Sequence, residues 1–188
     1  VVSLGLMAHF FGLGLGGGGL IYFFLSGVVG FGFGDIGVFY ALPRLGSRLT
    51  LLMAQCLAAP IAGLAEWAWL GTTLSWPQIL SVGVILLGIV IALAPRHIPA
   101  AGMPTFLAGM AFGLLAGTGQ GLGAVLSRKA YAEANAAGNW TGGEGLLESI
   151  WMGATTGYQR LLGGALIIAA FFFLSYIVRS WRSRPRPD

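Results

Sequence analysis

The stretch TFLAGMAFGLLAGTGQGLGAVLS, residues 105–127, contains no charged side chain and is followed directly by Arg128 and Lys129. Glycine recurs in it every four residues, at Gly109, Gly113, Gly117 and Gly121. In an α-helix this spacing places the glycines along one face, where a neighbouring backbone can approach closely. The stretch therefore predicts a membrane-crossing helix that packs tightly in a bundle.

The composition of the whole chain agrees with a membrane protein. Of its 188 residues 56% are hydrophobic and 9% are charged, and the mean hydropathy is +0.83. A soluble domain carries about a quarter charged residues, so this chain has too few to cover a globule in water. The net charge of +4 arises from basic residues at the ends of apolar runs. That placement is typical of headgroup anchoring and argues against nucleic-acid binding.

Six apolar segments are separated by short breaks, which predicts an all-α, polytopic bundle of about six membrane helices. The segments are residues 1–15, 20–42, 49–70, 75–95, 105–127 and 158–177. Pro43 is expected to stop the second segment and Gly71 the third. Ser75 and Pro77 form a good opening for the fourth. A second glycine stripe is expected in the second segment, at Gly27, Gly30, Gly34 and Gly37.

Residues 128–157 form the long polar connection of the chain. Its first part is expected to extend the fifth helix as far as Gly138. Its second part, GGEGLLESIWMG at residues 142–153, has the pattern of a short amphipathic helix lying at the membrane interface. The tail at residues 179–188 is rich in Arg and is expected to anchor at the headgroups.

The arginines and lysines of the loops fall on two sides of the membrane. One side collects seven: Arg44, Arg48, Arg96, Arg179, Arg182, Arg184 and Arg186. The other collects three: Arg128, Lys129 and Arg160. The positive-inside rule favours the first side as cytoplasmic.

Three polar residues lie inside apolar segments: Asp35, Glu66 and Gln120. A charged carboxylate near the bilayer centre costs about 2.5 to 3.5 kcal/mol on insertion scales, so such groups usually face a bundle interior or a water-filled path. Asp35 is a candidate for proton uptake and release. The alternative is that each residue is protonated or hydrogen-bonded to a neighbouring helix and serves only packing. That alternative is favoured for Glu66, which lies beside Trp67 near the interface, and for Gln120.

Residues 34–93 resemble three successive helices of EamA-type members of the drug/metabolite transporter superfamily. The shared features are Gly34-Asp35, Phe39-Tyr40-Ala41-Leu42, Gly46, Pro60, Leu70-Gly71, Gly83 and Gly88-Ile89-Val90. FLAGMAFGLLAGTGQGLGAVLSRKA, residues 106–130, is similar to the helix that opens the second repeat of that family, and residues 158–174 fit the helix after it. The family usually has Glu where this chain has Thr72.

The resemblance implies ten helices in two inverted five-helix repeats around a central cavity, of which this chain would supply helices two to seven. We therefore expect it to be a fragment of a longer protein. On this alignment residues 1–94 are the rest of the first repeat, 95–104 a connecting loop, 105–178 the start of the second repeat with its polar loop at 128–157, and 179–188 a basic tail. The family orientation would place Arg44 and Arg48 outside, opposite to the charge tally.

The resemblance also implies a multi-pass protein of the bacterial inner membrane that exports small metabolites or amino acids by alternating access. Its substrate pathway would include Asp35, Tyr40, Glu66 and Gln120. We expect no enzymatic activity, cofactor or metal, and as partners the bilayer, a small substrate, and either the missing helices or a second copy. A membrane enzyme would need more polar groups at one interface. A structural or assembly subunit without transport activity is the alternative, because the glycine stripes alone would suffice for it.

Overall fold

The computed structural model describes Phe10 and residues 15–71, 73, 75–93, 102–138 and 146–182. The described chain is helical and contains no strand, which confirms the all-α prediction. Its elements are α2 (Leu20–Gly27), the π-helix η1 (Val28–Gly34), α3 (Asp35–Leu70), α4 (Trp76–Leu93), α5 (Met103–Ala136) and α6 (Leu146–Arg182). The predicted first segment, residues 1–15, lies outside the described residues except for Phe10 and Leu15.

Within the described ranges, three helical stretches are long and apolar enough to cross a membrane: Leu20–Leu70, Met103–Ala136 and Ser149–Trp181. The first joins α2, η1 and α3, and a shorter apolar helix, Trp76–Gly88, follows it. Many large hydrophobic side chains on these helices face outward, including Phe173 at 68% and Ile91 at 74% exposure. An outer surface of this kind suits lipid and not water, so we describe the chain as a membrane protein.

The prediction that Pro43 stops the second segment is wrong, because the helix continues to Leu45 and breaks at Gly46. Gly46 has φ 77° and ψ 165°, a backbone conformation that glycine adopts far more readily than residues with a side chain. Pro43 has no backbone N–H and so leaves the Phe39 carbonyl without its usual helical donor. The Arg44 guanidinium donates a 2.6 Å hydrogen bond to the next carbonyl, that of Tyr40. The break divides α3 into a part that continues α2 and a part that returns.

The predicted opening of the fourth segment is confirmed by α4, which begins at Trp76. Gly71 ends α3 in the left-handed conformation, with φ 67°. The Gln78 side chain accepts hydrogen bonds of 2.9 Å from the Ser75 amide and from the Ser75 hydroxyl. Gln78 thus satisfies the Ser75 amide in the manner of a capping box.

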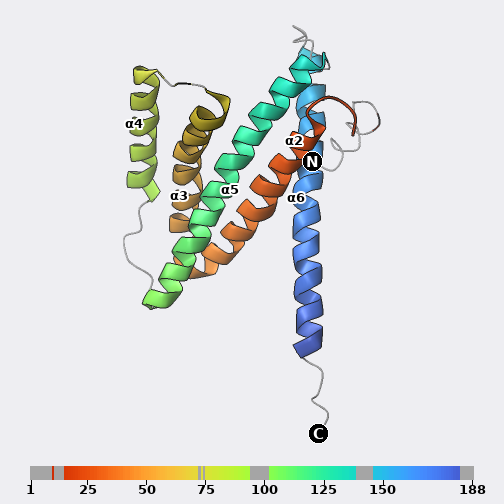
Figure 1. Cartoon of the computed structure of the whole chain (residues 1–188). Coiled ribbons are helices and arrows are strands. Elements are labelled where there is room, and N and C mark those ends of the chain that lie inside the picture. Colours follow the sequence, from red (N-terminus) through yellow and green to blue (C-terminus); the bar gives the residue numbers. More distant parts are fainter. Residues whose placement is uncertain are drawn as a thin grey trace.

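Figure 1 shows successive helical segments running in alternating directions, with α5 crossing the middle of the bundle. One side of α5 packs against the returning half of α3, and another side packs against α2 and η1. α6 packs beside α2 and η1 and then extends beyond the bundle (Figure 1). α4 contacts α3, and no heavy atom of the described chain lies within 4 Å of a Cβ built on Gly83 or Gly88.

Of the long polar connection at residues 128–157, the structure describes 128–138 and 146–157, and nearly all of these residues are helical. As predicted, the fifth helix extends beyond Arg128, and it ends at Ala136 before Gly138 with φ 69°. The expected separate interfacial helix is instead the first part of α6, which runs without a break from Leu146 to Arg182. The described residues contain no turn between the amphipathic pattern and the apolar segment, and a continuous helix keeps every backbone group hydrogen-bonded.

Candidate functional site

Charged side chains mark two levels of the bundle. At one level Arg44 packs at Gly109, whose added Cβ would lie 2.9 Å from Arg44 Cβ. At the other level Arg128 of α5 forms an ion pair with Glu66 near the end of α3. Gly109 and Arg128 are 19 residues apart on α5, which at about 1.5 Å per residue separates the two levels by about 28 Å.

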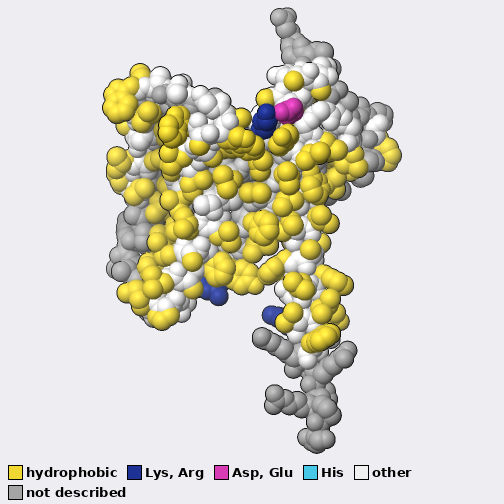
Figure 2. Space-filling model, viewed as in Figure 1, with side chains coloured by type: hydrophobic (Ala, Val, Ile, Leu, Met, Phe, Trp, Pro, Cys, Tyr) yellow, Lys and Arg dark blue, Asp and Glu magenta, His cyan; other side chains and the backbone are white. Residues whose placement is uncertain are grey.

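That separation matches a hydrocarbon core of about 30 Å. Figure 2 shows basic side chains at the upper and lower levels of the bundle and mainly hydrophobic side chains between them. We call the region between the two levels the apolar band. A bilayer aligned with this band would place Arg44 and Arg128 at opposite headgroup regions.

Asp35 lies near the middle of the apolar band. The preceding residue, Gly34, faces Gly119 of α5, and a Cβ on Gly119 would lie 2.8 Å from Gly34 Cα. Gly119 is ten residues after Gly109 and nine before Arg128. Asp35 is half-buried, and its carboxylate makes no hydrogen bond or ion pair with the described part of the chain. It therefore remains available for a proton or a ligand.

Gln120 is at the same depth. A Cβ on Gly34 would lie 3.4 Å from Gln120 Cγ, so the Gln120 side chain passes next to the residue before Asp35. Gln120 is half-buried. Two of the four predicted pathway residues thus lie at the same depth, on two helices that are distant in sequence.

The backbone before Asp35 is unusual, because η1 is a π-helix of seven residues. Isolated π turns are rare in helices and often occur at functional sites. Gly30, Gly32 and Gly34 are buried within η1 and allow close contact with the neighbouring helices. The predicted stripe is consequently divided between two neighbours: Gly27 faces Arg160 of α6, whereas Gly30, Gly34 and Gly37 face α5.

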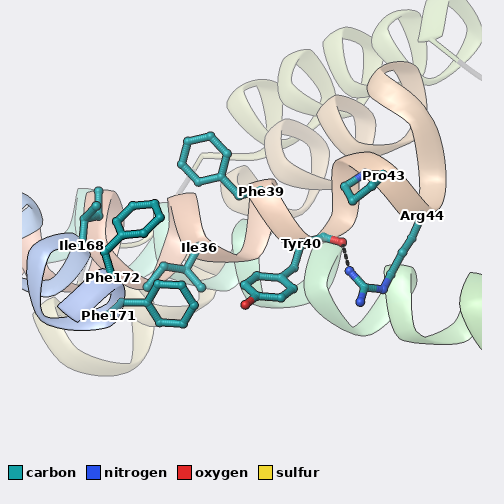
Figure 3. A pocket seen from close by; sticks show the side chains of 8 residues that line it. All are labelled: Ile36, Phe39, Tyr40, Pro43, Arg44, Ile168, Phe171 and Phe172. Carbon is teal, nitrogen blue, oxygen red and sulfur yellow. Dashed lines mark hydrogen bonds between the residues drawn. The ribbon is translucent and has the colours of Figure 1, made fainter. Parts of the chain in front are cut away.

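Tyr40 lies in a different place, at a pocket of about 310 Å³ between α3 and α6. Its ring stacks on Phe112 with centroids 4.9 Å apart and meets Phe171 edge-on at 5.9 Å. Figure 3 shows the labelled side chains around this pocket, with Ile36, Phe39 and Tyr40 coming from α3 and Ile168, Phe171 and Phe172 from α6. Neither Asp35 nor Gln120 lines this pocket. Residues five apart point about 140° from each other on a helix, which separates Tyr40 from Asp35.

Glu66 lies at one end of the apolar band, where it is paired with Arg128. Both residues line a cavity of about 730 Å³ between α3 and α4, together with Trp67 and Gly83. Tyr40 and Glu66 therefore occupy separate pockets, neither of which includes Asp35 or Gln120.

The four glycines of the fifth segment all face α3. The distances from a Cβ added at each glycine to the nearest atom of α3 are short: 2.7 Å to Leu45 for Gly109, 2.6 Å to Met53 for Gly113, 2.7 Å to Leu57 for Gly117 and 2.7 Å to the Ala58 carbonyl oxygen for Gly121. Sequence reasoning missed a second face of α5, formed by Gly119 and Gly123. A Cβ on Gly123 would lie 2.8 Å from Gly30 Cα. The i, i+4 spacing of this pair could have revealed it.

A buried hydroxyl pair joins α2 to α5 beside this second face. The Ser26 hydroxyl donates to the Gly123 carbonyl at 2.7 Å and lies 2.6 Å from the Ser127 hydroxyl. Ser26 is fully buried and Ser127 is 6% exposed. Small residues with hydroxyl groups are typical of the contacts between helices inside a membrane.

Arg160 is not in a loop, as the charge tally had assumed, but lies within α6. Its guanidinium carbon is 4.8 Å from the centroid of the Phe31 ring. Among the described residues its buried Nε atom has no hydrogen-bond partner. Arg160 is thus a basic residue inside a candidate membrane-spanning helix, stacked on the aromatic ring that follows Gly30.

Comparisons of the chain with protein-family models, with curated proteins and with solved structures return no match in any of the three.

Proposed function

We propose that the chain belongs to a multi-pass transporter that exports small metabolites or amino acids by alternating access, as its resemblance to EamA-type proteins implied. The observation that carries the proposal is Asp35. This carboxylate lies near the middle of the apolar band, is half-buried, and has no ion-pair or hydrogen-bond partner in the described chain. Intramembrane carboxylates of this kind usually serve a substrate or proton pathway.

The backbone next to Asp35 favours a hinge at η1. η1 replaces α-helical hydrogen bonding directly before it, and its glycines place little side-chain bulk against α5. A change between π and α geometry in η1 would turn the side chains that follow it about the helix axis. In this proposal η1 is the hinge, Asp35 is the coupling carboxylate, and Gln120 binds polar groups of the substrate.

The test is transport by the full-length protein in proteoliposomes. A panel of labelled amino acids and small metabolites is screened for flux, with and without a pH gradient. Asp35→Asn is expected to abolish pH-dependent flux while insertion into the membrane is unchanged. Glu133→Gln is the matched control, because Glu133 pairs with Lys129 outside the apolar band. Unchanged pH-dependent flux in Asp35→Asn would refute the coupling role.

A structural or assembly subunit is the second candidate, and the glycine faces of α5 favour it. Two faces of one helix pack closely against neighbouring helices, which stabilises a bundle whether or not it transports anything. Failure of every substrate in the panel to cross, together with co-purification of a stoichiometric membrane partner, would favour this second function.

A further inference from the structure

The aromatic pocket between α3 and α6 has a composition that the proposed transport function does not explain. Its lining is apolar except for Tyr40 and Arg44: Ile36, Phe39 and Pro43 come from α3, and Ile168, Phe171 and Phe172 come from α6. Figure 2 shows the lower part of α6 standing apart from the rest of the bundle, with a notch between them. We call this space the α3–α6 notch.

Basic residues flank the notch at the level of the headgroups. Arg44 follows Tyr40 by one helical turn and lies beside the level of Gly109, at the edge of the apolar band. Arg179 follows Phe172 by seven residues, so it lies on the same face of α6 two turns further along. Figure 2 shows basic side chains on both sides of the notch at its lower end.

No carboxylate balances these arginines in the described part of the chain. The described ion pairs, Glu66 with Arg128 and Glu133 with Lys129, are both at the opposite end of the bundle. One nitrogen of Arg44 donates to the Tyr40 carbonyl, and its guanidinium lies 5.2 Å from the Phe112 ring centroid. These two contacts hold the guanidinium in place, and other donors of its five N–H groups remain for an anion.

We propose that the α3–α6 notch binds an anionic phospholipid, with an acyl chain against Phe39, Phe171 and Phe172 and the headgroup phosphate between Arg44 and Arg179. The apolar lining matches the chain, and the position at the edge of the apolar band matches the depth of a headgroup. Arginine recognises phosphate through paired hydrogen bonds, and basic pockets between membrane helices bind anionic headgroups. The proposal does not depend on transport.

The experiment is native mass spectrometry of the purified full-length protein in detergent, titrated with phosphatidylglycerol or with phosphatidylcholine of the same acyl chains. We expect one bound phosphatidylglycerol to appear at a lipid concentration at least about fivefold lower than that needed for one bound phosphatidylcholine. Arg179→Gln should weaken phosphatidylglycerol binding about fivefold, in line with about 1 kcal/mol for one basic residue near a membrane surface. Lys129→Gln, the same change of charge at the other end of the bundle, should leave it unchanged.

A second variant and a competition with inorganic phosphate complete the experiment. Arg44→Gln should weaken phosphatidylglycerol binding to the same extent as Arg179→Gln does. If Arg44→Gln fails to give a monodisperse protein, Arg179→Gln decides alone, because Arg179 is exposed on α6. Millimolar inorganic phosphate should not displace the lipid, since the acyl chain supplies part of the binding; displacement would show a free-anion site instead. Equal binding of the two lipids, or equal weakening by Lys129→Gln and Arg179→Gln, would overturn the proposal.

Discussion

Gly119 of α5 and Gly34 at the end of η1 approach so closely that a Cβ on Gly119 would lie 2.8 Å from Gly34 Cα and 2.9 Å from the Val29 carbonyl oxygen. Both nearest atoms belong to the backbone, which cannot rotate away as a side chain can. The contact therefore fixes the distance between the two helices at the depth of Asp35.

Gly119→Ala should destabilise the bundle by about 1 to 3 kcal/mol, the usual range for overpacking a tight core. The free energy of unfolding is measured in mixed micelles with increasing dodecyl sulfate, followed by tryptophan fluorescence. Gly83→Ala on α4 is the matched control, because a Cβ there meets no heavy atom of the described residues within 4 Å. The control should be neutral or slightly stabilising, since alanine favours a helix over glycine. Equal effects of the two substitutions would contradict the close packing.

The Ser26 and Ser127 hydroxyls should contribute modestly to the same interface. Ser26→Ala removes the bond to the Gly123 carbonyl, but the Ser127 hydroxyl lies 3.0 Å from that carbonyl and can then give its one hydrogen to it. We expect a loss of about 0.6 kcal/mol of unfolding free energy and at most about 1.7 kcal/mol, the mean and the maximum measured for hydrogen bonds between membrane helices. A double-mutant cycle with Ser127→Ala should give a coupling energy above zero. Additive effects would show that the 2.6 Å contact contributes nothing.

The Glu66–Arg128 pair joins the ends of α3 and α5, and its contribution should be small. The Arg128 side chain is 64% exposed and the Glu66 side chain is 14% exposed, and ion pairs with such an open partner contribute about 0 to 1 kcal/mol. Glu66→Gln should lower the unfolding free energy within that range and lose its effect in 0.5 M salt. Lys129→Gln, which breaks an i, i+4 pair within one helix, is the control for a local pair. A loss above 2 kcal/mol for Glu66→Gln would show that the pair is shielded from solvent.

The membrane-helix character, the glycine face at Gly109 to Gly121 and the opening of α4 were predictable from local sequence. Apolar runs, four-residue spacing and the Ser75 opening each act within a few neighbouring residues. The end of the first long helix was not predicted correctly, because Pro43 and Gly46 both interrupt helices and the sequence does not rank them. In the structure the helix passes through Pro43 with one backbone hydrogen bond fewer and breaks at Gly46, where φ is 77°.

The grouping of the site residues depended on tertiary geometry. Asp35 and Tyr40 are close in sequence but face different surroundings, whereas Asp35 and Gln120 share a depth across two helices. The π-helix η1 had no signal in apolar periodicity, since its glycines are compatible with either winding. Its position directly before Asp35 could be found only from the backbone.

Asp35 gives the last prediction, which separates stability from function. A polar group with no described partner near the middle of the apolar band should destabilise the bundle. Asp35→Leu should therefore raise the unfolding free energy by about 1 to 3 kcal/mol. This value does not exceed the insertion cost of a carboxylate at the bilayer centre. Asp35→Asn should change it less, because the amide is also polar. The same dodecyl sulfate titration measures both. Under the proposed function the leucine variant is more stable and transports nothing. Destabilisation by leucine would mean instead that the carboxylate is bonded within the bundle and holds it together.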